Sequence, residues 1–321
     1  MRSTPYIPWM EYYLDFRYHF NDTYWSYFKD SLITIYSGLF QIRYIFCIIV
    51  LKVIIMKRIL ITGASGGMGL ETVKYLSMKD YYIYALDIKP LEEMKNVKSF
   101  IVDLTKKEEI EKVYESIKEE GPLDALIYLS GMYYMDSLIE ISEETLKKIY
   151  DINFFSVYNL NKIFMPLLNK SSRIVIITSE LAPLDPLPFN SIYSLSKSAL
   201  DKYAEALRQE LNLLDIDVVV IRPGAVNTSM IPASITNIER MEKETKYYQD
   251  VVYNFKDIVV KNESKTIEPI KISKLIEKTL IVKRPKLVYK TNNNPKLKML
   301  SILPKRMQLW IIKELLKKSP K

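Results

Sequence analysis

The chain has 321 residues and a net charge of +8, with a single cysteine, Cys47, so no disulfide can form within it. Its single histidine, His19, excludes a histidine-rich metal site and a Ser-His-Asp triad in the main domain, and we expect no metal. The positive charge gathers after residue 282, where twelve lysines and arginines accompany one acid, so a nucleic-acid partner is not expected. We expect a cytoplasmic protein, with membrane association as an alternative.

Residues 1–56 form an aromatic and apolar extension that holds fifteen Phe, Tyr and Trp residues. Its last part resembles a membrane segment, but Arg43 and Lys52 interrupt it. The uncharged run between them, Tyr44–Leu51, is far shorter than the ~20 residues that span a bilayer. Three interpretations stay open: an interfacial or marginally spanning anchor, a packed amphipathic extension, and an artefact of start-site choice, because Met56 directly precedes the first strand of the main domain.

Residues 57–282 alternate between short apolar runs and helical patterns. Continuous apolar strands separated by amphipathic helices indicate a parallel sheet that is covered on both faces. We therefore predict an α/β fold with a doubly wound parallel sheet, a Rossmann fold, in a single catalytic domain. The predicted strands are Arg58–Thr62, Tyr82–Asp87, Ser99–Val102, Leu126–Leu129, Arg173–Thr178 and Asp217–Ile221, with helices between them such as Glu108–Glu119 and Glu143–Asp151.

A glycine-rich turn follows the first predicted strand and opens a helix. Its glycines allow a tight turn and a close approach to a pyrophosphate, which the free N–H groups of the helix N-terminus would bind. The candidate cofactor-binding residues of this turn are Gly63, Ser65, Gly67, Met68 and Gly69.

An acid, Asp87, ends the second predicted strand, 24 residues after Gly63. At that place a carboxylate can accept hydrogen bonds from the adenosine ribose and would repel a 2′-phosphate. This favours NAD over NADP as the cofactor. Lys89, two residues further on, leaves NADP open.

Tyr193 and Lys197 are four residues apart, so a helix places both on one face. A nearby ammonium stabilises a phenolate, so we expect Lys197 to lower the pKa of Tyr193. Tyr193 could then exchange a proton with a substrate oxygen during hydride transfer. Ser179 closes the fifth predicted strand, where its hydroxyl could hold that oxygen, although an isolated Tyr-x-x-x-Lys is most often a surface pair.

Together these residues resemble a short-chain dehydrogenase/reductase of the short, single-domain branch, and the resemblance covers residues 57–282. It implies an NAD(P)-dependent oxidoreductase that acts on CH–OH groups and interconverts an alcohol and a ketone or aldehyde. The alternative is a non-catalytic dinucleotide-binding regulator or scaffold. The resemblance also implies a homo-oligomer. The implied catalytic residues are Asn153, Ser179, Tyr193 and Lys197, and the further cofactor contacts are Asp103 and Leu104, Gly131, Pro223, Gly224, Val226 and Thr228.

The sequence departs from the family pattern in one place. The fourth strand often ends Asn-Asn-Ala-Gly in this family, whereas Tyr128, Leu129, Ser130 and Gly131 stand here. The two asparagines that brace the sheet and the cofactor are therefore replaced, which points to weaker cofactor binding.

Apolar segments should flank the substrate. The loop Leu181–Phe189 and a lid within Ser229–Lys261 are rich in apolar residues, which predicts a lipophilic alcohol or ketone. Residues 283–321 form a basic amphipathic tail with a break at Pro304, loosely similar to the end of retinol- and hydroxysteroid-dehydrogenase-like members. Such a helix can make peripheral contact with an anionic membrane, or dock on the enzyme itself or on a dimer partner.

Overall fold

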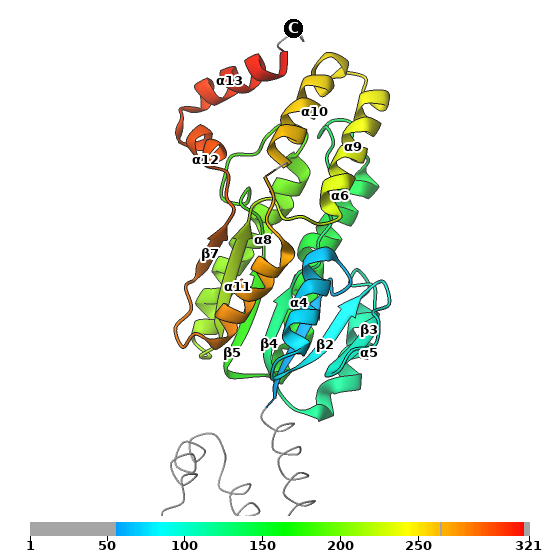
Figure 1. The fold of residues 1–321 in the computed structure, drawn as a ribbon, viewed down its shortest axis with the longest axis vertical. Coiled ribbons are helices and arrows are strands. Elements are labelled where there is room, and N and C mark those ends of the chain that lie inside the picture. The colour runs from blue at the N-terminus through cyan, green and yellow to red at the C-terminus, as the bar shows by residue number, and fades with distance from the viewer. Residues whose placement is uncertain (1–55, 264, 318–321) are drawn as a thin grey trace, which may run out of the picture. The chain divides into compact units, whose positions relative to one another are not determined.

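Among the residues that the structure describes, seven strands form one parallel sheet in the order β3-β2-β1-β4-β5-β6-β7 (Figure 1). The computed structural model describes residues 56–263 and 265–317, so the three interpretations of the extension fall on residues outside this part. The order runs outward in both directions from β1, which confirms the predicted doubly wound α/β fold. The strands are β1 (Lys57–Thr62), β2 (Tyr81–Asp87), β3 (Val97–Ile101), β4 (Leu123–Tyr128), β5 (Leu168–Ile177), β6 (Asp217–Pro223) and β7 (Val288–Thr291).

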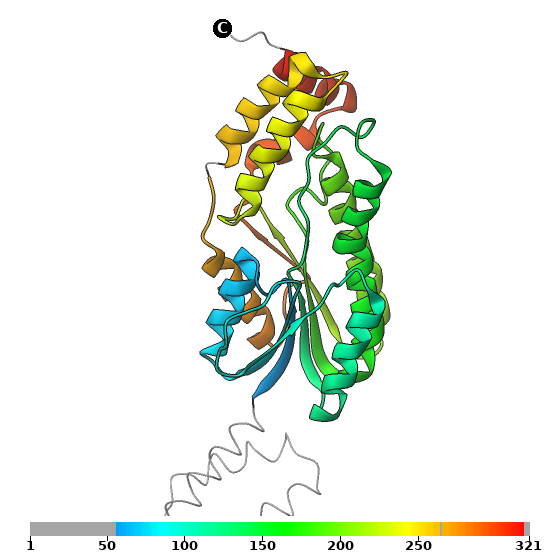
Figure 2. The same cartoon turned by 90° about the vertical axis from the view of Figure 1, so that its right-hand side faces the viewer.

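Helices cover both faces of this sheet (Figure 2). In β1, Ile59 and Ile61 belong to one apolar cluster and Leu60 to the other, as expected for a strand buried on both sides. The first cluster lies under α4 (Gly67–Ser77) and α11 (Pro269–Ile281), and the second lies under α5 (Lys107–Ile117), α7 (Ser156–Phe164) and α8 (Ser191–Asn212).

The seventh strand lies beyond the predicted end of the catalytic domain at residue 282. Val288–Thr291 pairs in parallel with β6, with Val288 opposite Val220 and Thr291 opposite Pro223. The strand has four residues, and only Tyr289 is buried, so it lacks the apolar run by which the central strands are recognised. The sheet therefore includes part of the segment that the sequence assigns to a separate tail.

Four helices lie beyond the carboxyl edge of the sheet (Figure 1). They are α9 (Met230–Glu244) and α10 (Gln249–Glu263) of the lid, and α12 (Pro295–Ile302) and α13 (Lys305–Lys317) of the tail. Leu316 of α13 is buried in a cluster with Ile238 and Phe255 of the lid and Phe189 of the loop before α8. The tail thus docks on the enzyme through this side, and Pro304 separates its two helices as expected. No helix in the described ranges is both long and apolar enough to cross a bilayer.

Candidate active site

The glycine-rich turn joins β1 to α4 in a conformation that only glycine fits well. Gly63 has φ +66°, and a Cβ on it would lie 2.6 Å from the Ser130 nitrogen. A Cβ on Gly69 would lie 1.9 Å from the Gly63 oxygen, and one on Gly67 would lie 2.8 Å from Cγ2 of Thr228. No side chain caps the N-terminus of α4. The turn therefore offers its free N–H groups to an anion such as a pyrophosphate.

Asp87 is held beside this turn at the end of β2. Its side-chain oxygens accept the backbone N–H groups of Ser65 at 2.9 Å and Lys89 at 3.0 Å. Asp87 is buried, whereas Lys89 is exposed. The carboxylate that the sequence assigns to the ribose is thus fixed next to the turn assigned to the pyrophosphate.

Asp103 and Leu104 follow β3. Just before them, the N–H of Val102 donates to the backbone carbonyl oxygen of Asp87 at 2.8 Å. Burial raises the pKa of Asp103, but hydrogen bonds from the Thr105 hydroxyl at 2.7 Å and N–H at 3.0 Å outweigh it, and the pKa is lowered. The carboxylate of Asp103 thereby shapes the loop on the Asp87 side of the site.

Asn153 lies in a π-helical turn, Asp151–Phe155, that joins α6 (Glu143–Tyr150) to α7. Turns of this kind recur at functional sites. The side chain is fully buried, and its Oδ1 accepts the N–H of Met132 at 2.7 Å. Its Nδ2 donates to the Met132 oxygen at 3.0 Å and to Oγ of Ser196 at 2.9 Å. Asn153 therefore fixes the segment after β4 against α8.

Tyr193 and Lys197 both lie in the first turns of α8 and are buried. Lys197 Nζ donates to the Ile177 oxygen at 3.1 Å, and burial lowers the pKa of Lys197 to about 8. Burial also raises the pKa of Tyr193 to about 12, against a hydrogen bond with Ser179 that lowers it. In the free protein the pKa of Tyr193 is therefore raised and not lowered as expected, because burial is the largest influence on the phenol and Lys197 is not among the groups that shift it.

A buried ion pair that the sequence did not reveal braces α8 one turn after Lys197. Asp201 accepts Nε of Arg222 at 2.9 Å on one oxygen and Nη2 at 2.6 Å on the other. It also accepts the hydroxyl of Thr178 at 3.1 Å. Because Thr178 follows β5 and Arg222 lies in β6, this pair fixes α8 to two strand ends.

Other residues replace the missing asparagines as braces of the sheet. The hydroxyl of Tyr128 donates to Oδ1 of Asn161 at 2.7 Å, and Nδ2 of Asn161 donates to the hydroxyl of Tyr203 at 3.1 Å. The hydroxyl oxygens of Ser130 and Thr62 lie 3.0 Å apart. The end of β4 is thus tied to α7, α8 and β1 by a different set of hydrogen bonds.

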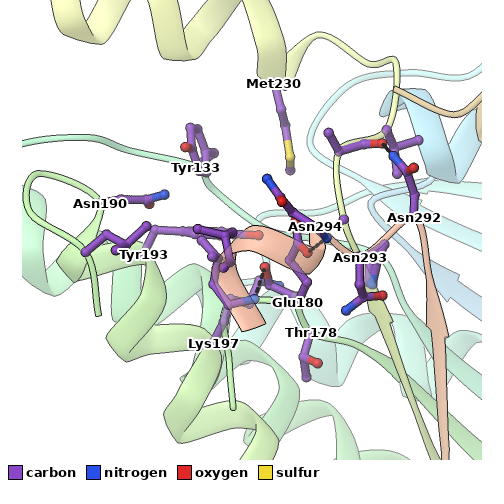
Figure 3. A pocket seen from close by; sticks show the side chains of 18 of the residues that line it. Tyr133, Thr178, Glu180, Asn190, Tyr193, Lys197, Met230, Asn292, Asn293 and Asn294 are labelled. Carbon is purple, nitrogen blue, oxygen red and sulfur yellow. Dashed lines mark hydrogen bonds between the residues drawn. The ribbon is translucent and has the colours of Figure 1, made fainter. Parts of the chain in front are cut away.

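A cavity of about 480 Å³ opens where these elements meet (Figure 3). Many of its lining side chains are apolar, including Leu129, Met135, Ile177, Leu187, Phe255 and Val259. The predicted site residues on its wall are Met68, Gly131, Ser179, Tyr193, Lys197, Pro223, Gly224, Val226 and Thr228. Gly63, Ser65, Gly67, Gly69, Asp87, Asp103, Leu104 and Asn153 do not line this cavity.

Part of the wall was not predicted. Glu180, Tyr133 and Asn190 line the cavity, and so does the segment Asn292–Leu297. In Figure 3, Asn292 and Asn293 lie across the cavity from Asn190 and Tyr193, and Met230 enters from α9. Close approach at Gly224 admits this segment, because a Cβ there would lie 2.0 Å from the Asn292 oxygen. No local sequence pattern predicts a contact between segments so far apart in the chain. The glycine at position 224 was the one indication that another backbone segment lies close to it.

Known proteins resemble this chain in sequence and in fold. A family model described as short chain dehydrogenase matches residues 57–238. A 3-ketodihydrosphingosine reductase of Bacteroides thetaiotaomicron is 32% identical over 229 residues, which cover 71% of this chain and 84% of that protein. Estradiol 17-beta-dehydrogenase 2 of Mus musculus is 30% identical over 63% of this chain and 59% of its own length. A solved short chain dehydrogenase family protein from Francisella tularensis has a TM-score of 0.61 and 25% identity, over 73% of this chain and 96% of that one.

Proposed function

The chain belongs to the short-chain dehydrogenase family and is an NAD(P)-dependent oxidoreductase, and from this premise we propose that it interconverts a lipophilic alcohol and its ketone or aldehyde. One observation carries the proposal: Ser179, Tyr193 and Lys197 line a single, largely apolar cavity at the carboxyl edge of the sheet. Two relatives, a 3-ketodihydrosphingosine reductase and an estradiol 17-beta-dehydrogenase, support a lipophilic substrate.

The residues present fit a nicotinamide dinucleotide. The glycine turn leaves a cradle that any Cβ would fill, and it is held next to the Asp87 carboxylate. Asp103 and Leu104 would flank the adenine, whereas Gly131 and the segment Pro223–Thr228 would hold the nicotinamide end. When bound, this cofactor supplies or accepts the hydride.

The side chains of the protein would transfer the proton to or from the substrate oxygen and stabilise the charge that develops. Ser179 would hold the substrate oxygen by donating a hydrogen bond, and Tyr193 would deliver a proton to it during reduction and remove it during oxidation. Burial raises the pKa of Tyr193 to about 12 in the free protein, so the phenol carries the proton that reduction would use. Lys197, with a pKa of about 8, would remain mostly charged and stabilise the phenolate that results, while Asn153 fixes the wall behind Lys197.

A screen of long-chain and steroid ketones, followed through the absorbance of the reduced nicotinamide, tests this function directly. Turnover of at least one such ketone is expected. Cofactor binding without turnover of any carbonyl compound would instead favour the non-catalytic scaffold.

We further propose that NAD(H) is preferred over NADP(H), because the buried Asp87 stands where a 2′-phosphate would meet its negative charge. Replacing Asp87 with Asn keeps an acceptor for the N–H of Ser65 but removes the charge. The Kd for NADH should rise about tenfold, as expected for loss of hydrogen bonds to a charged group, while NADPH should bind no more weakly than before. Fluorescence titration of both cofactors measures the two constants.

Lys89→Ala serves as the companion variant. Lys89 is exposed, and only its backbone N–H contacts Asp87, so its loss should leave NADH binding within about twofold and weaken any residual NADPH binding. If Asp87→Asn weakened NADPH more than NADH, the proposed preference for NAD(H) would be overturned.

We propose a cytoplasmic enzyme whose tail makes peripheral contact with an anionic membrane. Met299, Ile302, Leu309 and Trp310 of α12 and α13 are 67%, 74%, 68% and 62% exposed. Lysines and an arginine surround them, and the start of α12 lines the cavity, so the membrane would lie close to the route of a lipophilic substrate.

Changing both Leu309 and Trp310 to Asp should reduce binding to anionic liposomes at least tenfold, since each buried side chain of this size contributes about 1.5–3 kcal/mol. Co-sedimentation with anionic and with neutral vesicles measures the effect. Leu213→Asp is a matched control, because Leu213 is 82% exposed at the end of α8. Point variants are preferable to removing the tail, because Leu316 is part of the lid core. Unchanged sedimentation of the double variant would exclude this surface.

A homo-oligomer is also proposed. Phe155, Tyr158 and Leu195 are 50%, 43% and 39% exposed and lie near Asn153 and Tyr193 in the chain. Exposed aromatic and apolar side chains at these positions support association through the helices on that side of the sheet.

A further inference from the structure

A second and much smaller cavity, of about 10 Å³, lies beside the reaction cavity, between the loop that precedes α8 and the two tail helices. Its own wall includes Leu184, Pro186, Leu300 and Ile312. Three side chains line both cavities and stand between them: Leu181, Leu187 and Leu297. The two cavities are therefore consecutive parts of one largely apolar path that begins at the reacting groups.

The outer end of this path reaches the surface of the protein. Pro186 is exposed there, and Leu184 and Leu300 are partly exposed. Beside them Lys305 forms an ion pair with Asp185, and the two side chains are 69% and 34% exposed. An ion pair in contact with water contributes little to stability, so this contact does not close the path firmly.

The helix α12 is a weakly held part of the wall. None of its residues is buried. Before it, the N–H of Asn294 donates to Oε2 of Glu180 at 2.5 Å (Figure 3), and after it, Nε2 of Gln308 donates to the Leu303 oxygen at 2.7 Å. An element with few buried contacts opens locally at a low free energy. Leu297, which is itself only partly buried, can therefore turn out of the path without disturbing the sheet.

The lid closes its side of the reaction cavity more firmly. Its helices share a buried apolar cluster with Leu316 of α13. Nη2 of Arg240 in α9 lies 2.8 Å from Oδ2 of Asp136, and the hydroxyl of Thr245 donates to Glu140 at 2.8 Å. Opening the lid would break these contacts, whereas movement of the α12 side of the wall leaves them intact.

We propose that a passage leads from the reaction cavity past Leu297 to the surface, and that the hydrocarbon chain of the substrate lies in it. Leu297 is the gate of this passage and determines specificity for chain length. Each methylene that enters the passage leaves water for a wall of leucine and isoleucine side chains, which favours long chains. The inference rests on the proposed function, because it requires a lipophilic substrate.

The test compares two methyl ketones, octanone and octadecanone, dispersed in the same nonionic detergent. The wild type should show the higher kcat/KM with octadecanone. In Leu300→Trp the indole obstructs the passage beyond the gate, and Leu300 does not line the reaction cavity. The kcat/KM for octadecanone should therefore fall at least about tenfold while that for octanone stays within about twofold, since one group too many in a closed pocket changes this constant by about 10–200-fold.

A second variant tests the gate in the opposite direction. Leu297→Ala widens the passage where the two cavities meet, so the ratio of kcat/KM for octadecanone to that for octanone should rise at least about twofold, as expected where opening of a wall limits the rate. Lys298→Trp is the matched control, because it places the same indole on an exposed position of α12 outside both cavities and should keep the wild-type ratio.

Binding of NADH, followed by fluorescence, shows that each variant is folded. An unchanged ratio in Leu300→Trp, or an equal loss of kcat/KM for both ketones, would overturn the passage and leave the proposed function intact. A lower ratio in Leu297→Ala would overturn the role of Leu297 as the gate. Failure of the wild type to reduce either ketone would count against the proposed function itself, and the passage would fall with it.

Discussion

Replacing Tyr193 with Phe should lower kcat by a factor of about 10²–10⁴, the contribution that a positioned proton donor makes to catalysis. The change removes one hydroxyl from a buried ring that packs edge-on against Tyr133 with centroids 4.7 Å apart. Phenylalanine preserves that contact, so the free energy of unfolding and the Kd for NADH should change little. Steady-state kinetics with the best ketone, together with fluorescence titration of NADH, measures both quantities.

Tyr114→Phe is the matched control. Tyr114 lies on α5, packs edge-on against Phe164 and takes no part in the cavity, so the same loss of a hydroxyl should leave kcat unchanged. A Tyr193→Phe enzyme that kept most of its rate would show that another group transfers the proton.

Replacing Asp201 with Ala should lower the free energy of unfolding by about 3–5 kcal/mol, the usual effect of removing one partner of a buried ion pair. The side chains of Arg222 and Asp201 are 11% and 5% exposed, so the substitution leaves a guanidinium buried without its counter-charge. The hydroxyl of Thr178 also loses its acceptor. Denaturant unfolding should register the change, and kcat should fall as well because α8 carries Tyr193 and Lys197.

Two further variants test the cause. Replacing Asp201 with Ala and Arg222 with Met together removes both charges and should recover much of the lost free energy. Glu111→Ala breaks the exposed pair with Lys107 on α5 and should cost less than about 0.5 kcal/mol. A loss of under about 1 kcal/mol for Asp201→Ala would mean that solvent reaches Arg222 and that the brace is weak.

The sequence predicted those parts of the fold that carry a local signal. Strands β1, β2, β4, β5 and β6 carry apolar runs because they are buried on both faces, whereas β3 at the edge of the sheet has no buried residue. Tyr193 and Lys197 could be recognised as a pair because helical spacing is fixed. β7 was missed because Lys290 interrupts it and the sheet covers it only in part. The hydrogen bond from the Asn294 N–H to the Glu180 carboxylate was not predicted, because 114 residues separate the two.

The pKa shift of Tyr193 also could not be predicted from the sequence. Spacing places an ammonium near Tyr193, but it does not tell how far the phenol is removed from water. Desolvation depends on the three-dimensional packing around Tyr193, and in the free protein it reverses the expected direction of the pKa shift.

The late position of β7 and Asn292–Leu297 in the chain has a consequence for biosynthesis. A nascent polypeptide that has emerged only as far as α11 presents the backbone edge of β6 without its neighbour, and this edge is rich in valine and isoleucine. Such an intermediate lacks the Asn292–Leu297 wall of the cavity, and its unpaired β6 edge can pair with other chains. Premature termination before residue 288 should thus yield an aggregation-prone product, and catalytic competence should arise only after Asn292–Leu297 has been synthesised.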